Sequence, residues 1–214
     1  MRSRFDEQLA VLNHKMIEMS ALCEELIAKA SHALLTGDTA LSREILQDGE
    51  GIDQSEKEIE GLCVKLLLQQ QPVAGDLRQI SAALKMVTDI ERIGDQAEDI
   101  AEIIPFLKDR KMEHCDLIRG MAQSTIRMVN QSIDAFVKKD AGLAEDVIAQ
   151  DDIVDEFFLK MKRLLIDMIA ENPQQGEFAL DLLMIAKYFE RIGDHAVNIA
   201  QWVIYSVTGE RRGA

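Results

Sequence analysis

Apolar side chains recur at every third or fourth residue along nearly the whole chain. A clear example is the series Leu9, Leu12, Met16, Met19, Cys23, Leu26 and Ala30. This spacing matches the 3.6-residue turn of an α-helix, whereas a half-buried strand would alternate with a period of two. The pattern therefore predicts an all-α protein built from amphipathic helices.

Helix-stopping residues divide this pattern into six long segments. Gly37, Pro72 and Pro173 interrupt it, and Asp38 and Asp140 stand where an N-cap is expected. The predicted helices cover residues 5–36, 39–71, 75–105, 112–139, 141–172 and 177–208. Helices of about 30 residues are about 45 Å long, and short loops between them favour antiparallel bundles.

Glycine inside the second predicted helix interrupts the regular pattern. Residues 48–51 read Asp-Gly-Glu-Gly, and each interior glycine costs a helix up to about 1 kcal/mol. We therefore expect a local bend or break at this point.

The two halves of the chain repeat one another. The segment ERIGD at residues 91–95 recurs at 190–194, and the turn at residues 37–38 corresponds to residues 139–140. A charged stretch at residues 108–111 looks like a linker. The sequence therefore predicts two tandem antiparallel three-helix bundles, covering residues 1–107 and 112–210.

Each half carries acidic residues four positions apart, so that both side chains lie on one face of a helix. These pairs are Glu91 with Asp95, Glu190 with Asp194, and Asp151 with Asp155. The spacing of the last pair is matched in the first half by Gly49 and Asp53, so one carboxylate is missing there.

In the second half, the two acidic pairs fall at the same height of neighbouring helices. Asp155 lies 18 residues before Pro173 and Glu190 lies 17 residues after it, which also sets Asp151 level with Asp194. Facing carboxylates repel one another and need a cation or protonation. Oxygen-only ligands suit Mg²⁺, Ca²⁺, Mn²⁺ or oxidised iron. The alternative is that these acids simply lie on a solvated surface.

Composition and charge narrow the functional classes. The chain has 24 Lys and Arg against 38 Asp and Glu, a net charge of −14, which argues against nucleic-acid binding and against an anionic membrane surface. With 47% hydrophobic residues the chain is expected to fold. No apolar run reaches the roughly 18 residues of a membrane span, and the N-terminus lacks a signal-peptide core. We therefore expect a cytoplasmic protein without membrane insertion.

Catalytic motifs such as GxSxG, HExxH and the phosphate-binding P-loop do not occur, so the sequence favours a non-enzyme. Arg92 and Arg191 are predicted to pair with acids on other helices. The glycines of the repeated motif, Gly94 and Gly193, are predicted to mark close helix packing.

The segment QQPVAGDLR at residues 70–78, followed by the two copies of ERIGD, resembles the PhoU family over nearly the whole chain. The resemblance implies two tandem three-helix bundles and multinuclear iron or zinc clusters on E(D)xxxD motifs. Carried over, the metal ligands are Asp53, Glu91 and Asp95 in the first half and Asp151, Asp155, Glu190 and Asp194 in the second, with Asp99 and Asn198 as further candidates. Because Gly49 stands where an acid is expected, metal loading is predicted to be weaker or smaller in the first half.

The resemblance also implies a biological role. PhoU-like proteins are accessory to the phosphate ABC transporter and restrain the phosphate-starvation response, through contacts with the transporter, including its ATPase subunit, and with a sensor histidine kinase. The family analogy also favours a homodimer. A metal-dependent phosphatase or phosphate-processing enzyme is the alternative, and a metal-free helical scaffold is a third possibility.

Overall fold

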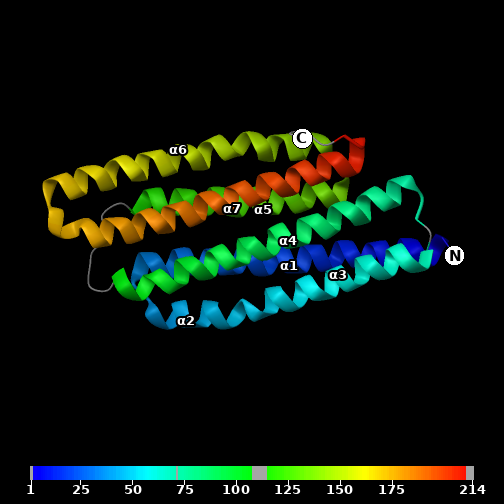
Figure 1. The fold of residues 1–214 in the computed structure, drawn as a ribbon, viewed down its shortest axis with the longest axis horizontal. Helices are drawn as coiled ribbons and strands as arrows, with labels where there is room; N and C mark the ends of the chain where they lie inside the picture. Colours follow the sequence, from blue (N-terminus) through cyan, green and yellow to red (C-terminus); the bar gives the residue numbers. More distant parts are fainter. Residues whose placement is uncertain (1, 71, 108–114, 211–214) are drawn as a thin grey trace.

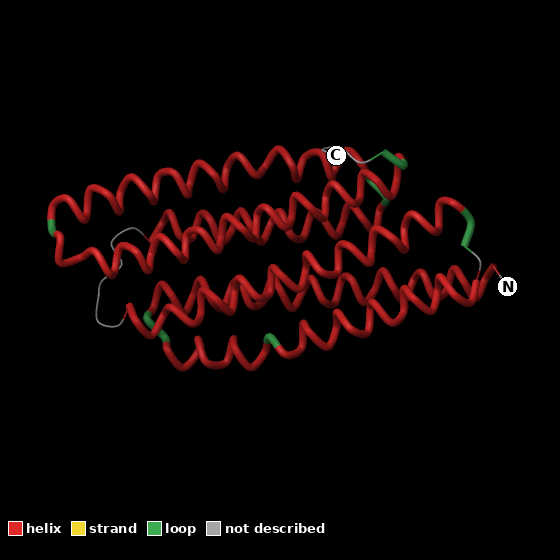
Figure 2. The backbone as a smooth tube through the Cα atoms, in the orientation of Figure 1, coloured by secondary structure: helices red, strands yellow, loops and turns green. Residues whose placement is uncertain are grey.

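The computed structural model describes residues 2–70, 72–107 and 115–210. Throughout these ranges the regular elements are helices (Figures 1 and 2), which confirms the predicted all-α class. They are α1 (Arg2–Thr36), α2 (Thr39–Asp48), α3 (Glu50–Gln70), α4 (Ala74–Ile103), α5 (Cys115–Lys138), α6 (Ala141–Glu171) and α7 (Gly176–Thr208), with short 3₁₀ turns η1 (Ile104–Leu107) and η2 (Pro173–Gln175). The predicted linker at 108–111 lies outside the described residues, so the domain bounds 1–107 and 112–210 stay a prediction.

The predicted helix ends agree with local backbone chemistry. Gly37 ends α1 with a left-handed φ of 71°, and the Asp38 carboxylate accepts hydrogen bonds from the backbone N–H groups of Ala40 and Leu41. At the equivalent turn of the second half, Lys139 has a φ of 54°, and Asp140 caps α6. The two halves therefore use the same turn with a different residue in the left-handed position.

The expected interruption near residue 49 is a bend between α2 and α3. Gly49 keeps right-handed helical angles, and its N–H donates to the Ile45 carbonyl at 3.1 Å. Its own carbonyl accepts from the Ile52 N–H at 2.8 Å, a tighter i to i+3 bond. The second predicted helix thus becomes two helices that follow one another.

The two repeats pack side by side through equivalent helices. In Figure 1, α6 lies along one edge and α2 with α3 along the other, with α5, α7, α1 and α4 between them. The most extensive contact joins α4 to α7, and α1 also packs on α5. The last long helix of each repeat, α4 or α7, therefore forms the centre of the molecule.

Contacts between α4 and α7 show that these helices run antiparallel. The Asp89 carboxylate of α4 lies 2.9 Å from His195 Nδ1 and accepts a hydrogen bond from Asn198 Nδ2 at 3.2 Å. Further along α4, Asp99 faces Arg191, which comes earlier in α7. The two ERIGD segments consequently lie opposite each other, and the repeats are arranged end for end.

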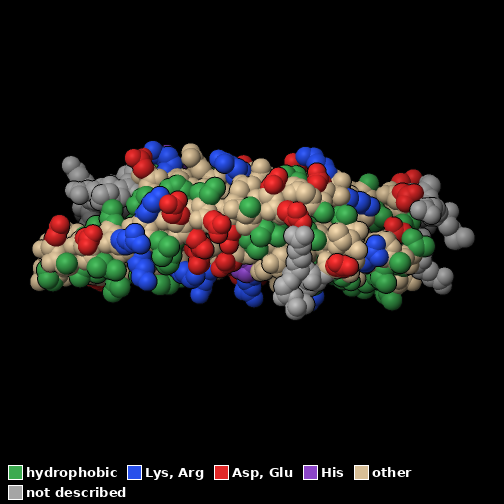
Figure 3. All heavy atoms as spheres, turned by 90° about the horizontal axis from the view of Figure 1, so that it is seen from above, with side chains coloured by type: hydrophobic (Ala, Val, Ile, Leu, Met, Phe, Trp, Pro, Cys, Tyr) green, Lys and Arg blue, Asp and Glu red, His purple; other side chains and the backbone are tan. Residues whose placement is uncertain are grey.

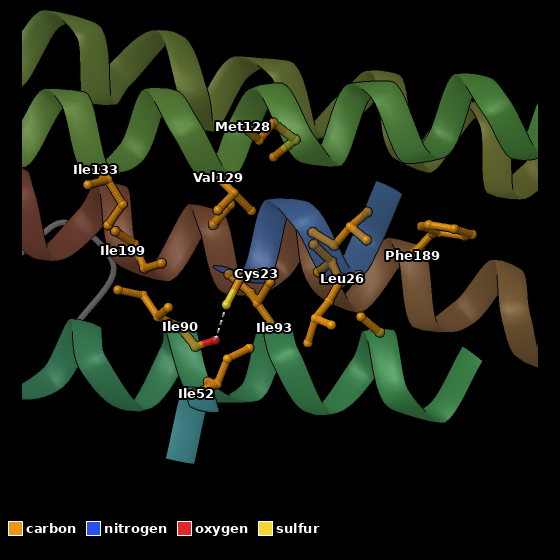
Figure 4. Packing of buried hydrophobic residues seen from close by; sticks show 14 of the residues in the cluster. Cys23, Leu26, Ile52, Ile90, Ile93, Met128, Val129, Ile133, Phe189 and Ile199 are labelled. Carbon is orange, nitrogen blue, oxygen red and sulfur yellow. Dashed lines mark hydrogen bonds between the residues drawn. The ribbon is translucent and has the colours of Figure 1, made fainter. Parts of the chain in front are cut away.

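The apolar core is continuous across both repeats. Figure 4 shows Cys23 of α1 and Ile90 of α4 close to side chains of α5 and α7, including Val129 and Ile199, all of them buried. The Cys23 thiol donates a hydrogen bond to the Ile90 carbonyl at 3.3 Å. This core holds the acidic motifs at fixed positions on the outer sides of α4 and α7.

None of the helices in the described ranges combines the length and the apolar character that crossing a membrane requires.

Candidate functional site

The acidic group of the second repeat is centred on Asp151 of α6. One of its carboxylate oxygens, Oδ1, is buried and has no hydrogen-bond partner. A Cβ atom placed on Gly193 of α7 would lie 3.0 Å from this oxygen and 3.6 Å from Val154. The prediction of close packing at Gly193 is therefore confirmed, and the missing side chain makes room for a carboxylate.

Carboxylates of α6 and α7 act on the carboxylate of Asp151. The pKa of Asp151 is raised to about 6, first by burial and then by the negative charges of Asp194, Asp155 and Glu190. The heights counted from Pro173 thus agree with these three side chains lying within electrostatic range of Asp151. Because folding raises the pKa of Asp151 from its ordinary value of 3.8, the free energy of unfolding falls as the pH rises from about 4 towards 6. A bound cation would offset this loss of stability.

Viewed from the α6 side, Asp and Glu side chains gather near the middle of the long axis (Figure 3). Basic and apolar side chains surround this group on the same face. Further Asp and Glu side chains lie towards both ends of this face, so its acidic character extends beyond the central group.

The first repeat brings together Glu91 and Asp95 of α4 with acids of α3. Burial raises the pKa of Glu91, and the charges of Asp95, Glu56 and Asp53 raise it further, while Arg92 lowers it. The three predicted ligands of this half therefore lie in one electrostatic environment. Glu56, one turn beyond Asp53, belongs to the same surroundings.

Glu98 is a member of this group that the sequence reasoning missed. Its carboxylate lies directly against Gly49, where a Cβ atom would collide with it. Burial raises the pKa of Glu98 to about 7, followed by the charges of Asp95 and Asp53. The spacing was a usable signal, because Glu91, Asp95 and Glu98 follow the i, i+4, i+7 pattern of one helix face.

Asp99 and Asn198, the further candidates, are placed at the contact between the repeats. Asp99 has a pKa raised by burial and by Glu102 and Asp95, and lowered by Arg191 of α7. Asn198 uses its Nδ2 to donate to Asp89. Asn198 therefore joins α7 to α4, and Asp99 lies within electrostatic range of Arg191.

Cations already accompany several of these acids. Arg92 contacts Asp95 at 2.9 Å and Glu91 at 3.4 Å, so the expectation that it pairs with another helix was wrong. Its long side chain reaches the next turn of its own helix, which a count of adjacent positions overlooks. For Arg191 the pairing stays a prediction, although its positive charge lowers the pKa of Asp99 of α4. In the second repeat, Lys187 pairs with Glu190.

The donor chemistry fits a metal ion, although the side chains are not gathered as a finished ligand set. The donors are carboxylate oxygens, which suit hard cations, and Asp151 Oδ1 is buried without a partner. In the ranges that the structure describes, however, no group of three or more Asp, Glu, His or Cys side chains converges to hold an ion. Lys187 forms an ion pair with Glu190, and Arg92 forms one with Asp95. A metal ion can bind these carboxylates only after the Lys187 and Arg92 side chains move away.

The remaining chemistry-bearing side chains have structural surroundings. Cys23 is fully buried and its thiol pKa is raised by burial, which disfavours a reactive thiolate. His195 contacts Asp89 across the repeats, and Glu24 accepts a hydrogen bond from Asn130 at 3.0 Å. These contacts fix α1 against α5 and α4 against α7.

Comparison with known proteins gives a consistent result. A family model described as PhoU domain matches residues 16–104 and 118–203. The chain belongs to the PhoU family. It is 33% identical to a "Phosphate-specific transport system accessory protein PhoU homolog" of Clostridium acetobutylicum, over 98% of this chain and 97% of that protein. A homolog of the same name from Aquifex aeolicus is 37% identical, over 95% and 93% of the two chains.

Solved PhoU structures share the fold of this PhoU-family chain. The crystal structure of PhoU from Pseudomonas aeruginosa superposes with a TM-score of 0.91 at 33% identity, covering 96% of this chain and all of that one. The phosphate transport system regulatory protein PhoU from Streptococcus pneumoniae gives a TM-score of 0.89 at 25% identity, covering 98% and 100%. The family resemblance inferred from the sequence motifs is thereby confirmed.

Proposed function

We propose that this chain is an accessory protein of a phosphate transport system and that it acts as a helical adaptor in the phosphate-starvation response. The observation that carries the proposal is the similarity over nearly the full length to proteins named phosphate-specific transport system accessory proteins. Agreement over both repeats matters, because an adaptor depends on the whole surface of the molecule rather than on one local motif.

The surroundings of the charged residues support an adaptor over a phosphatase. Lys187 and Arg92, which could otherwise hold phosphate oxygens, are paired with Glu190 and Asp95 of the acidic groups. The thiols of Cys23 and Cys63 are buried, and burial raises the pKa of each. These residues stabilise helix faces and do not present a nucleophile to solvent.

The partners follow from the family. We propose that the chain contacts the ATPase subunit of a phosphate ABC transporter and a sensor histidine kinase in the cytoplasm, and that it forms a homodimer. Its net charge of −14 favours partner surfaces that carry Lys and Arg.

Metal binding is the second component of the proposal. Asp53, Glu91 and Asp95 would hold ions in the first repeat, and the second repeat would use Asp151, Asp155, Glu190 and Asp194. A bound cation supplies positive charge that neutralises the facing carboxylates. This function is supported by the raised pKa values of Asp151 and Glu91, which reflect burial first and then the negative charges of the neighbouring acids.

Co-purification with the transporter ATPase subunit tests the adaptor role. Tagged chain is expected to retain the ATPase subunit of its own organism at high phosphate, because the starvation response is restrained under that condition. Elemental analysis of protein purified without chelator is expected to find bound metal. An E190Q/D194N variant should contain less metal than wild type, since it removes two carboxylates of the second repeat.

The exposed pair Asp167 and Glu171 of α6 offers a matched control. A D167N/E171Q variant changes the net charge by the same amount away from both acidic groups and should keep the metal content of wild type. Failure of wild type to retain the ATPase subunit at any phosphate concentration would contradict the adaptor role. Absence of metal from wild type would contradict the metal component alone.

A further inference from the structure

The two repeats differ at one position of the acidic groups, and the structure fixes which residues correspond there. Gly94 of α4 packs against Ile52 of α3, and Gly193 of α7 packs against Val154 of α6. This equivalence places Gly49, one turn before Ile52, at the position that Asp151 occupies before Val154. The first repeat therefore lacks the carboxylate that its second helix should provide.

The space beside Gly49 is occupied by a side chain from the neighbouring helix. The Glu98 carboxylate reaches across from α4 and lies where a side chain at position 49 would begin. In the second repeat the residue equivalent to Glu98 is Val197, which carries no charge. The first repeat thus has Gly49 beside Glu98, and the second repeat has Asp151 and Val197 at the equivalent positions.

The surroundings of Glu98 match those of Asp151. Glu98 lies among the negative charges of Asp95 and Asp53, as Asp151 lies among those of Asp194 and Asp155. Within the described part of the chain, the ion pairs of these helices leave Glu98 out, while Arg92 pairs with Asp95. A neutral side chain would fill the same space without adding repulsion, so packing does not explain the charge.

We propose that Glu98 replaces, from α4, the carboxylate that Gly49 lacks, and that it completes a cation site of the first repeat with Asp53, Glu91 and Asp95. The inference rests on the metal-binding component of the proposed function. It reverses the expectation that Gly49 leaves the first repeat with weaker or smaller metal loading. The ligand class is a hard cation bound by carboxylate oxygens.

Mn²⁺ binding measured by electron paramagnetic resonance tests this assignment. All variants carry D151N, D155N, E190Q and D194N, which replace the four proposed ligands of the second repeat, so that the remaining bound Mn²⁺ reports on the first. In this background E98Q and E98V should weaken Mn²⁺ binding at least about tenfold, because losing even a hydrogen-bond partner of a ligand typically costs roughly 10- to 100-fold. E98Q preserves the shape of the side chain and guards against loss of fold.

A rescue variant provides the sharpest comparison. G49D combined with E98V installs the aspartate and valine of the second repeat, and it should restore the Mn²⁺ binding that E98V loses. E171V removes an exposed carboxylate at the end of α6, away from both acidic groups, and should bind Mn²⁺ like the background.

The outcomes separate this inference from the proposed function. Unchanged Mn²⁺ binding in both E98Q and E98V would overturn the role of Glu98 while leaving metal binding intact. Lack of Mn²⁺ binding by the wild-type chain would overturn the metal component and the role of Glu98 together. Retention of the transporter ATPase subunit is independent of either result.

Discussion

Gly94 and Gly193 occupy equivalent places in α4 and α7, where each allows a side chain of the neighbouring helix to approach the backbone. At Gly94 the neighbour is Ile52, and at Gly193 it is the carboxylate of Asp151 together with Val154. A glycine in the interior of a helix costs up to about 1 kcal/mol relative to alanine. The close contacts explain why α4 and α7 keep it.

Replacing Gly94 by alanine is expected to destabilise the protein. The new Cβ would lie 2.6 Å from Ile52 Cδ1 and 3.3 Å from Cγ2, and Ile52 is buried. Overpacking of this kind costs about 1–3 kcal/mol, whereas the gain in helix propensity is at most about 1 kcal/mol. Urea unfolding followed by circular dichroism measures the net loss in the free energy of unfolding.

Gly61 of α3 provides the control for this substitution. It is exposed, and a Cβ there would meet no atom within 4 Å. G61A should therefore raise the free energy of unfolding by up to about 1 kcal/mol. Equal stabilities for G94A and G61A would show that Ile52 adjusts without cost.

At the same scale, sequence reasoning located most of the acidic positions but not Glu98. Asp151 and Asp194 were found because their four-residue spacing and the distance to Pro173 are visible in the sequence. The role of Glu98 depends on a contact with Gly49, which lies on another helix. The spacing within α4 places Glu98 on the same face as Glu91 and Asp95, but it does not show that Glu98 fills the space beside Gly49.

At the scale of single elements, the turn between the first two helices of each repeat shows the same design with different side chains. Gly37 and Lys139 both adopt left-handed backbone angles, and Asp38 and Asp140 follow them as N-caps. A residue with a Cβ pays roughly 1–2 kcal/mol in this conformation, whereas glycine does not. The second repeat therefore stores strain that the first avoids.

Substituting Lys139 by glycine is expected to raise the free energy of unfolding by up to about 1 kcal/mol. Relief of the left-handed strain exceeds the extra entropy that glycine gives the unfolded chain, which is about 0.5–1 kcal/mol. Thermal unfolding detects the change as a higher Tm. The neighbouring K138G variant changes the last residue of α5, which has ordinary helical geometry, and should lower Tm instead. A decrease in both variants would contradict the strain at Lys139.

The helix ends were predictable from these local signals, whereas the path of the chain at Gly49 was predictable only in part. The glycines at positions 49 and 51 indicated a bend or break. That the backbone of Gly49 stays helical follows from hydrogen bonds on both of its sides, to Ile45 and from Ile52. Those bonds depend on how α2 and α3 rest on the other helices.

At the scale of the whole molecule, the two repeats share one core and are joined by polar contacts. α4 packs on α7 and α1 on α5, and Asp89 contacts His195 and Asn198 between them. The relative orientation of the repeats could not be derived from the sequence, because distances counted from Pro72 and Pro173 relate helices only within a repeat. The end-for-end arrangement is seen in the contacts of Asp89 on α4 with His195 and Asn198 on α7.

Because the core is shared, both repeats are expected to unfold in one transition. Trp202 of α7 is the single tryptophan, so its fluorescence reports on the second repeat, while circular dichroism reports on all helices. The two signals should give the same midpoint in urea, as two-state unfolding requires. A lower or higher midpoint for the Trp202 fluorescence would show that the repeats unfold separately.

The end-for-end arrangement also means that the rod has almost the same outline when it is turned round. The hairpin at Pro72 then takes the place of the hairpin at Pro173, at opposite tips of the molecule (Figure 1). A partner that must bind in one orientation has to recognise places where the halves are unlike. Lys29, which forms ion pairs with Glu25, Glu44 and Asp48, is one such place. At the corresponding place in the other half, Gln150 donates a hydrogen bond to Gln131.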